Sequence, residues 1–171
     1  ILDTARMGAD WIISAIVGFA GVPPTIEAVK HCKIVAVANK ESLVCAGKLL
    51  IDTAITFKSK LLPVDSEHNA IFQCINSENP KTIKKVTLTA SGGPFRNFTL
   101  SEMANVTVAQ ATNHPTWEMG KRISIDSASM FNKALELIEA KYFFDLNSDQ
   151  LEVVIHPESI IHSLVTFIDN S

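Results

Sequence analysis

The sequence has 171 residues and a formal net charge of -3, and 47% of its residues are hydrophobic. A chain of this length and composition can bury a sizeable core, which excludes a mainly disordered state and predicts one domain or two small ones. Its basic residues are scattered, and this argues against binding to nucleic acid or to an anionic membrane surface. The longest apolar stretch, residues 11–22, is shorter than a membrane-spanning helix and is interrupted by Gly18 and Gly21.

Neither end of the sequence has the features of a natural terminus. The first residue is Ile1, and neither a basic segment nor a signal-peptide cleavage site follows it, so we expect the N-terminus to be cut. The apolar run at residues 160–168 is followed by no closing element. We therefore expect the C-terminus to be truncated as well.

The first 64 residues alternate apolar runs with helical stretches. The apolar runs predict three short strands, at residues 11–17, 33–38 and 61–64. Two segments between them predict helices, residues 23–31 and residues 42–57, with Ser42 as the N-cap of the second. Such an alternation of strands and helices predicts a parallel sheet of the doubly wound α/β class.

After the third of these strands the pattern changes, which places a domain boundary near residue 63. The next elements are predicted as a helix, a turn and a strand, at residues 69–75, 77–81 and 85–89. Residues 91–121 contain several glycines and are expected to form a long connection with at most one short helix, near residues 101–111. Because connections of this length are usually functional, we predict that this one acts as a lid.

The last third of the sequence is expected to add two strands and a helix. These are a strand at Ile123 and Ile125, a helix that ends near Phe144 and a strand that begins at residues 151–155. Either Asp126 or Ser127 is expected to be the N-cap of the helix, because both residue types favour that position.

Two carboxylates near the end of a predicted strand are candidates for a metal site. Asp65 and Glu67 follow the strand at residues 61–64, and because a strand sends alternate side chains to one face, the two carboxylates can converge. Oxygen ligands favour Mg²⁺ or Mn²⁺ over zinc. Taken alone, however, such a pair is more often a solvated acidic turn.

Glu136 offers a third carboxylate, at the edge of an apolar helix stripe. It is flanked by Leu135 and Leu137, and a charge beside the core persists only if it is paired or bound to metal. An equally weighted alternative is a surface ion pair between Lys133 and Glu136. Together, the three carboxylates would supply three metal ligands and leave room for a chelating substrate.

Two segments are candidate phosphate cradles. The backbone amides of Ser91, Gly92 and Gly93 can point together, and the helix start expected at Ser127 carries Lys133 in its second turn. Each signal is weak alone, since a Gly-Gly turn or an N-cap serine is usually only structural. No G-x-G-x-x-G motif occurs, so if a dinucleotide binds here, its pyrophosphate turn is missing from this sequence.

Four further residues have positions that suggest a site. Lys40 follows the strand at residues 33–38 at its carboxyl end, where open α/β sheets bind ligands. His114 lies in the long connection, where core packing does not easily explain a histidine. His156 and His162 could face a site or fill the interior, and the interior is the more common place.

Six motifs extend over nearly the whole sequence. They are AIVGFAG at residues 15–21, ANKESLV at 38–44, LPVDSEHNAIFQ at 62–73, TASGGPFR at 89–96, NHPTWEMGKRISIDSASMFNKALELIEA at 113–140 and IHPESIIHS at 155–163. Together, and in this order, they closely resemble the 1-deoxy-D-xylulose 5-phosphate reductoisomerase family. Six separate motifs in family order do not coincide by chance, so the resemblance is specific.

The resemblance implies an NADPH-dependent enzyme of the methylerythritol phosphate route to isoprenoids. It implies isomerisation of 1-deoxy-D-xylulose 5-phosphate, followed by reduction of the resulting aldehyde to 2-C-methyl-D-erythritol 4-phosphate. It also implies a homodimer that uses Mg²⁺ or Mn²⁺ and is located in the bacterial cytoplasm or in a plastid-type organelle. By this resemblance, residues 1–62 are the second half of a doubly wound, Rossmann-like cofactor domain, and residues 63–171 are most of an α+β catalytic domain.

The resemblance assigns roles to individual residues as well. The implied metal ligands are Asp65, Glu67 and Glu136, and the implied catalytic residues are Lys40, Glu67, His114 and His162. The implied substrate-binding residues are Ser66, Ser91, His114, Trp117, Met119, Ser127, Asn132 and Lys133, among which His114, Trp117 and Met119 belong to a mobile lid. The implied cofactor-binding residues are Ala15, Asn39, Lys40, Glu41 and Gly120.

Two alternatives stay open at this stage. The metal and phosphate groups do not by themselves require hydride transfer, so one alternative is a nicotinamide-independent aldolase or isomerase that acts on a sugar phosphate. The other is a non-catalytic fragment that binds metal and a phosphorylated ligand. Since the family's Gly-rich cofactor unit and its C-terminal helical domain lie outside the sequence, we expect this stretch to be inactive alone.

Overall fold

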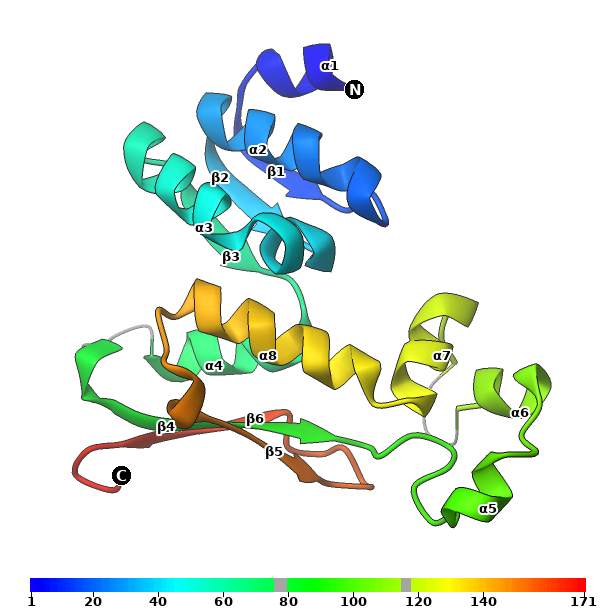
Figure 1. The fold of residues 1–171 in the computed structure, drawn as a ribbon. Coiled ribbons are helices and arrows are strands. Elements are labelled where there is room, and N and C mark those ends of the chain that lie inside the picture. Colours follow the sequence, from blue (N-terminus) through cyan, green and yellow to red (C-terminus); the bar gives the residue numbers. More distant parts are fainter. Residues whose placement is uncertain (76–79, 115–117) are drawn as a thin grey trace.

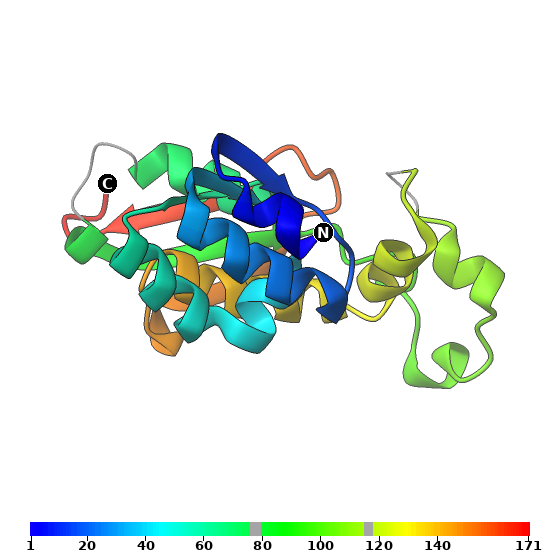
Figure 2. The ribbon, with the colours of Figure 1, turned by 90° about the horizontal axis from the view of Figure 1, so that it is seen from above.

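The computed structural model describes residues 1–75, 80–114 and 118–171. Its strands form two three-stranded sheets, which lie one above the other in Figure 1. A group of short helices projects to one side of both sheets, as Figure 2 shows from above. None of the described helices could cross a lipid bilayer.

The first sheet is parallel and has β2 in the middle. Its strands are β1 (Ala9–Ser14), β2 (Cys32–Val37) and β3 (Lys60–Pro63). The helices of this part are α1 (Leu2–Arg6), α2 (Val22–His31) and α3 (Lys40–Phe57). All five elements predicted for the first 64 residues are confirmed, with their ends shifted by at most three residues.

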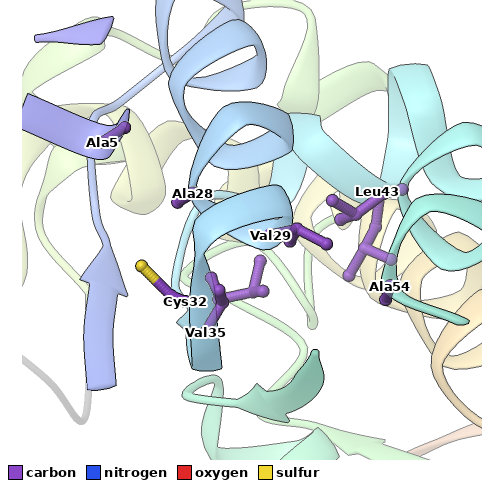
Figure 3. Packing of buried hydrophobic residues seen from close by; sticks show 9 residues of the cluster. Ala5, Ala28, Val29, Cys32, Val35, Leu43 and Ala54 are labelled. Carbon is purple, nitrogen blue, oxygen red and sulfur yellow. The ribbon is translucent and has the colours of Figure 1, made fainter. Parts of the chain in front are cut away.

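Helices α2 and α3 pack on one face of this sheet and enclose the first hydrophobic core. Val29, Val35 and Leu43 lie in this core (Figure 3). The strand residues Trp11 and Ile13 point away from it and are about half exposed, at 52% and 50%. A doubly wound arrangement, which needs helices on both faces, therefore stays a prediction.

The second sheet is mixed and has β4 in the middle. Its strands are β4 (Ile83–Ala90), the parallel β5 (Leu151–Ile155) and the antiparallel β6 (Ser163–Phe167). Helices α4 (Ser66–Ile75) and α8 (Phe131–Phe143) cover one of its faces. The second core lies between them and the sheet and includes Ile71, Val86, Leu88 and Ala140. The predicted strands at residues 85–89 and 151–155 are confirmed.

Helix α8 lies between the two parts of the molecule and contributes to both cores (Figure 1). Its residue Ala140 belongs to the second core, whereas Tyr142 packs against the first. Because one helix serves both cores, the fold by itself does not divide the chain at a single residue. The domain boundary near residue 63 stays a prediction.

The side projection consists of α5 (Leu100–Met103), α6 (Val108–Thr112) and α7 (Lys121–Ala128). Three short 3-10 helices complete the structure: η1 (Phe19–Gly21), η2 (Pro80–Thr82) and η3 (Ser148–Gln150). Residues 91–121 thus contain two short helices before α7, not the single one expected. Each begins with a capping box, formed by Thr99 with Glu102 and by Thr107 with Gln110. The turn expected at residues 77–81 lies largely outside the described residues.

The strand predicted at Ile123 and Ile125 is wrong, because both residues lie in helix α7. This helix starts after Gly120, and the Ser124 hydroxyl donates a hydrogen bond to the Gly120 carbonyl at 3.0 Å. Two apolar residues among polar neighbours are too few to distinguish a two-residue repeat from a short helix whose exposed face is polar.

The helix starts differ from those expected at three further places. Helix α3 is capped by Asn39, whose side chain accepts a hydrogen bond from the Ser42 amide, so Ser42 is not its cap. Helix α4 begins at Ser66, three residues earlier than predicted. Asp126 and Ser127 lie inside α7, and α8 begins after Met130, which has a positive φ of 60° and no side-chain cap.

The contact between α3 and α8 leads to a testable prediction. A Cβ atom added at Gly47 would lie within 2.6 Å of three ring carbons of Tyr142. We expect Gly47→Ala to lower the free energy of unfolding by about 1–3 kcal/mol, because overpacking forces the ring and helix apart. Urea denaturation measures this effect.

A matched control is Gly120→Ala, because a Cβ atom at Gly120 meets no atom within 4 Å and the residue has a negative φ of -61°. It should change the free energy of unfolding by less than about 0.5 kcal/mol. Equal stability of the Gly47→Ala variant and the unchanged chain would show that the two helices are not closely packed there.

Candidate active site and metal centre

A cavity of about 410 Å³ lies between the second sheet, α8 and the side projection. Eleven of the residues singled out in the sequence line it: Asp65, Ser66, Glu67, Ser91, His114, Met119, Ser127, Asn132, Lys133, Glu136 and His162. These residues come from six separate segments of the chain. The fold therefore brings most of the sequence-predicted site together.

The carboxyl ends of β2 and β3 place the first two charged groups of the site. Lys40 follows β2 and Asp65 follows β3, and since these strands pair in parallel, their ends meet at one edge of the sheet. The Lys40 ammonium and the Asp65 carboxylate form an ion pair there. Both side chains are largely buried, each 17% exposed.

Asp65 and Glu67 converge for a different reason from the one expected. They do not alternate along a strand, because Glu67 lies in the first turn of α4. The turn is held by Asp65, whose carboxylate accepts a hydrogen bond from the Glu67 amide at 3.3 Å and whose carbonyl accepts one from the Asn69 amide at 2.8 Å.

Helix α8 supplies the opposite wall of the site. Glu136 and Glu139 are one turn apart and are almost completely buried. The Lys133 ammonium lies 2.7 Å from Glu67 and 2.5 Å from Glu136, and Asn132 donates a hydrogen bond to the other Glu136 oxygen. The expected alternative, an ion pair between Lys133 and Glu136, does form, but it is buried and does not lie on the surface.

Four carboxylates, those of Asp65, Glu67, Glu136 and Glu139, thus form a carboxylate cluster around two ammonium groups. The Lys40 ammonium contacts Asp65 and lies 3.5 Å from Glu136 and 3.4 Å from Glu139. With every group ionised, the cluster and the two ammonium groups carry a net charge of -2. A divalent cation would cancel this charge.

The excess of negative charge is visible in the pKa values of the cluster. Burial and the charge of Asp65 raise the pKa of Glu136 to about 7, and burial raises that of Glu139 to about 8. Burial alone would raise the pKa of Asp65 as well, but the charge and hydrogen bond of Lys40 outweigh it, and the pKa is lowered to about 2. For Lys40, the three carboxylates outweigh burial and raise the pKa above its ordinary value.

Three members of the cluster are arranged to fit a divalent cation. Asp65, Glu67 and Glu136 can each place one oxygen atom within 4.8 Å of the others. Glu136 Oε2 is buried and lacks a hydrogen-bond partner within the described ranges, since its contact with Lys133 does not have hydrogen-bond geometry. Carboxylate oxygens are the ligands that Mg²⁺ and Mn²⁺ prefer, so the residues fit either ion.

His68 and Glu139 are parts of the site that the sequence analysis did not identify. The completely buried His68 donates a hydrogen bond from Nε2 to the Glu136 carbonyl at 2.9 Å, and burial lowers its pKa and favours the neutral ring. Its Nδ1 atom lies 3.6 Å from Asp65 and 4.0 Å from Glu139. For Glu139, the sequence did contain a signal: it is three residues after Glu136, and this spacing puts both side chains on one side of α8.

The two candidate phosphate cradles meet where the Gly-Gly turn contacts α7. Gly92 and Gly93 have positive φ angles of 84° and 68°, and the Gly93 amide donates a hydrogen bond to the Ser91 hydroxyl at 3.2 Å. A Cβ atom at Gly93 would lie 2.6 Å from the Ser127 carbonyl, so the turn packs directly on the end of α7. The expected helix start at Ser127 is wrong, because this residue lies near the end of α7.

The histidines of the candidate site have different surroundings. His114 Nε2 and the Ser91 hydroxyl are hydrogen-bonded at 3.0 Å, and burial and the Arg96 charge lower the pKa of His114. His162 lines the cavity, whereas His156 forms an ion pair with the exposed Glu158. Trp117 lies outside the described residues, so a lid over the cavity stays a prediction.

The predicted cofactor-binding residues do not line this cavity. Ala15 and Gly120 are exposed, and the Asn39 side chain is held by the Ile16 carbonyl at 2.6 Å. Glu41 forms an ion pair with Arg122 of α7 and so connects the two parts of the chain. Lys40 does not line the cavity either, but its ammonium group contacts Asp65 and Glu136, which do.

Comparisons with known proteins agree with the sequence motifs. Residues 2–47 match the family model described as 1-deoxy-D-xylulose 5-phosphate reductoisomerase, and residues 61–144 match the model described as its C-terminal domain. The protein of that name from Allorhizobium ampelinum is 54% identical over 99% of this chain and 43% of its own length. The one from Zymomonas mobilis is 52% identical over all of this chain and 44% of its own length.

Solved structures of proteins with that name share the fold of this chain over the aligned part. The Zymomonas mobilis reductoisomerase in complex with NADPH has a TM-score of 0.91 and 50% identity, and a reductoisomerase in complex with NADPH, fosmidomycin and magnesium has 0.93 and 48%. Each alignment covers 99% of this chain and 44% of the other. The chain spans less than half the length of the relatives it matches, and over that length it belongs to the 1-deoxy-D-xylulose 5-phosphate reductoisomerase family.

Proposed function

We propose that this chain provides the metal and substrate site of an NADPH-dependent enzyme that converts 1-deoxy-D-xylulose 5-phosphate to 2-C-methyl-D-erythritol 4-phosphate. The observation that carries the proposal is the group formed by Asp65, Glu67 and Glu136, with its negative charge, on the wall of a cavity that also contains a Gly-Gly turn and a lysine. Family membership supports the choice of reaction, because reductoisomerases of this family have been solved with NADPH and with magnesium.

In this proposal, Asp65, Glu67 and Glu136 hold Mg²⁺ or Mn²⁺. A bound divalent cation would polarise the carbonyl and hydroxyl oxygens of a chelating substrate. Ser66 and Asn132 line the cavity beside the carboxylates and would bind substrate hydroxyl groups. Both side chains already form hydrogen bonds to members of the carboxylate cluster, which fixes their direction.

The phosphate group would be bound beside the Gly-Gly turn and the end of α7. Ser91, Ser127 and Lys133 line the cavity, and the Ser91 hydroxyl is already oriented by its hydrogen bond with His114. Since phosphate is dianionic near neutral pH, the ammonium group of Lys133 would form the strongest single contact.

The remaining roles concern hydride transfer and exclusion of water. Lys40 would lie near the nicotinamide and the substrate, and His162 would line the reacting end of the cavity. Met119, which also lines the cavity, would close over the substrate together with His114 and Trp117 and exclude water. Ala15, Asn39, Glu41 and Gly120 would contact NADPH.

We further propose that residues 1–62 form the second half of a Rossmann-like cofactor domain and residues 63–171 most of the catalytic domain. The parallel order of β1, β2 and β3 supports the first assignment, and the mixed sheet that carries the cavity supports the second. The homodimer and the location in the bacterial cytoplasm or a plastid-type organelle stay predictions.

The reaction is tested on a full-length protein that contains this sequence. Oxidation of NADPH, followed by its absorbance at 340 nm, should require both 1-deoxy-D-xylulose 5-phosphate and a divalent cation. Consumption of the sugar phosphate without NADPH oxidation would instead support a nicotinamide-independent aldolase or isomerase.

The metal assignment predicts the effect of Glu136→Gln on cation binding. The amide keeps the shape of the side chain but removes one of three charged ligands, so Mg²⁺ affinity should fall at least about tenfold while the fold is retained. Calorimetric titration and circular dichroism measure the two effects. Glu118→Gln removes a charge from the same cavity wall outside the ligand group and should change the affinity little. Unchanged affinity in Glu136→Gln would exclude Glu136 as a ligand.

The raised pKa values predict that Mg²⁺ binding depends on pH. Glu136, with a pKa of about 7, must lose its proton to bind a cation, so protons compete with Mg²⁺ below that pH. The apparent Kd should therefore fall about tenfold from pH 6 to pH 8 and then level off. Titrations in two buffers of different ionisation enthalpy should show proton release on binding. A Kd that is constant or rises over this range would contradict the prediction.

A further inference from the structure

The two lysines of the site, Lys40 and Lys133, differ in whether all of their carboxylate partners belong to the proposed metal ligands. Lys133 has two carboxylate partners, Glu67 at 2.7 Å and Glu136 at 2.5 Å. Both belong to the group of three that fits a divalent cation. When a cation takes these oxygens, Lys133 loses both of its partners.

Lys40 is different because one of its three carboxylate partners lies outside that group. Asp65 and Glu136 are members, but Glu139, 3.4 Å from the Lys40 ammonium, is not. Glu139 does not line the cavity and is 2% exposed, so neither solvent nor a ligand in the cavity reaches it freely.

The surroundings of Glu139 contain little else that would explain a buried carboxylate. Within the described ranges, its only ammonium partner is Lys40. The His68 ring has Nδ1 4.0 Å away, and the nearby carboxylates Asp65 and Glu136 repel its charge. His68 Nδ1 has no hydrogen-bond partner in the same ranges. A buried carboxylate with so few partners is costly to the fold, which suggests that it is retained for its effect on Lys40.

We propose that Glu139 is a positioning residue that keeps Lys40 in place when a divalent cation binds to Asp65 and Glu136. The cation would withdraw these two carboxylates from Lys40 and repel its ammonium group, and the remaining partner would be the Glu139 carboxyl group, which accepts a hydrogen bond from the Lys40 ammonium at 3.4 Å. Lys133 has no such partner and would turn toward an anionic group of the substrate. The inference rests on the proposed function, because it assumes the cation site.

The test measures how fast each lysine is acetylated by an amine-reactive ester, with and without Mg²⁺, by mass spectrometry of peptides from the chain. An ammonium held by a carboxylate reacts slowly, because only the neutral, accessible amine is acetylated. In the unchanged chain, Mg²⁺ should increase the rate at Lys133 at least about threefold and leave the rate at Lys40 nearly constant. In Glu139→Gln, Mg²⁺ should increase the rates at both lysines.

Two variants and one titration make the outcome decisive. Glu139→Asp keeps the charge and should restore most of the protection of Lys40, which a purely structural role of Glu139 would not explain. Glu118→Gln, on the cavity wall, should behave like the unchanged chain. Calorimetry on each variant establishes whether Mg²⁺ binds, and circular dichroism establishes whether the variant folds.

Two results would overturn the inference while leaving the cation site intact. One is Mg²⁺ binding to Glu139→Gln with Lys40 still protected, and the other is Mg²⁺ binding to the unchanged chain with Lys40 released. Absence of Mg²⁺ binding to the unchanged chain would overturn the proposed function and, with it, the inference.

Discussion

The excess negative charge of the carboxylate cluster is the constraint on which the rest of the site depends. Its four carboxylates share two ammonium groups, those of Lys40 and Lys133, and buried charge without compensation is strongly unfavourable. In the absence of a cation the fold tolerates the excess because protons are retained, as the raised pKa values of Glu136 and Glu139 indicate. In the proposed function a divalent cation would replace protons of the cluster, and its double positive charge would cancel the excess.

The cluster can form only because segments far apart in the sequence are fixed against one another. The paired ends of β2 and β3 bring Lys40 and Asp65 together, and α8 brings Glu136 and Glu139 to them from about 70 to 100 residues further along the chain. The position of α8 depends in turn on its two cores, and on the contact of Tyr142 with α3 in particular. Packing far from the cavity therefore sets distances between charges inside it.

The sequence predicts the first half of the fold well, because apolar runs alternate there with helical stretches and each strand contains a short apolar run. It also singles out Asp65, Glu67 and Glu136 as candidate ligands, because a carboxylate beside an apolar helix stripe needs a partner and adds to an acidic pair that is weak evidence alone. It does not predict α7, where Ile123 and Ile125 fit a strand equally well, or the start of α8, which has no side-chain cap. The sequence also does not single out Glu139, because the proposed role of this residue depends on its contact with Lys40, which is 99 residues away.

Two neighbouring sets of side chains could each hold a cation, and the structure indicates which set leaves room for a substrate. Asp65, His68 and Glu139 can place ligand atoms within 4.8 Å of one another, as the proposed metal ligands can. Neither His68 nor Glu139 lines the cavity, and both are almost fully buried, so a cation held there would have no coordination position open to a substrate. A catalytic cation needs such positions, and Asp65, Glu67 and Glu136 all face the cavity. His68 and Glu139 are therefore better suited to holding Lys40 and Asp65 in place behind the site than to binding the cation itself.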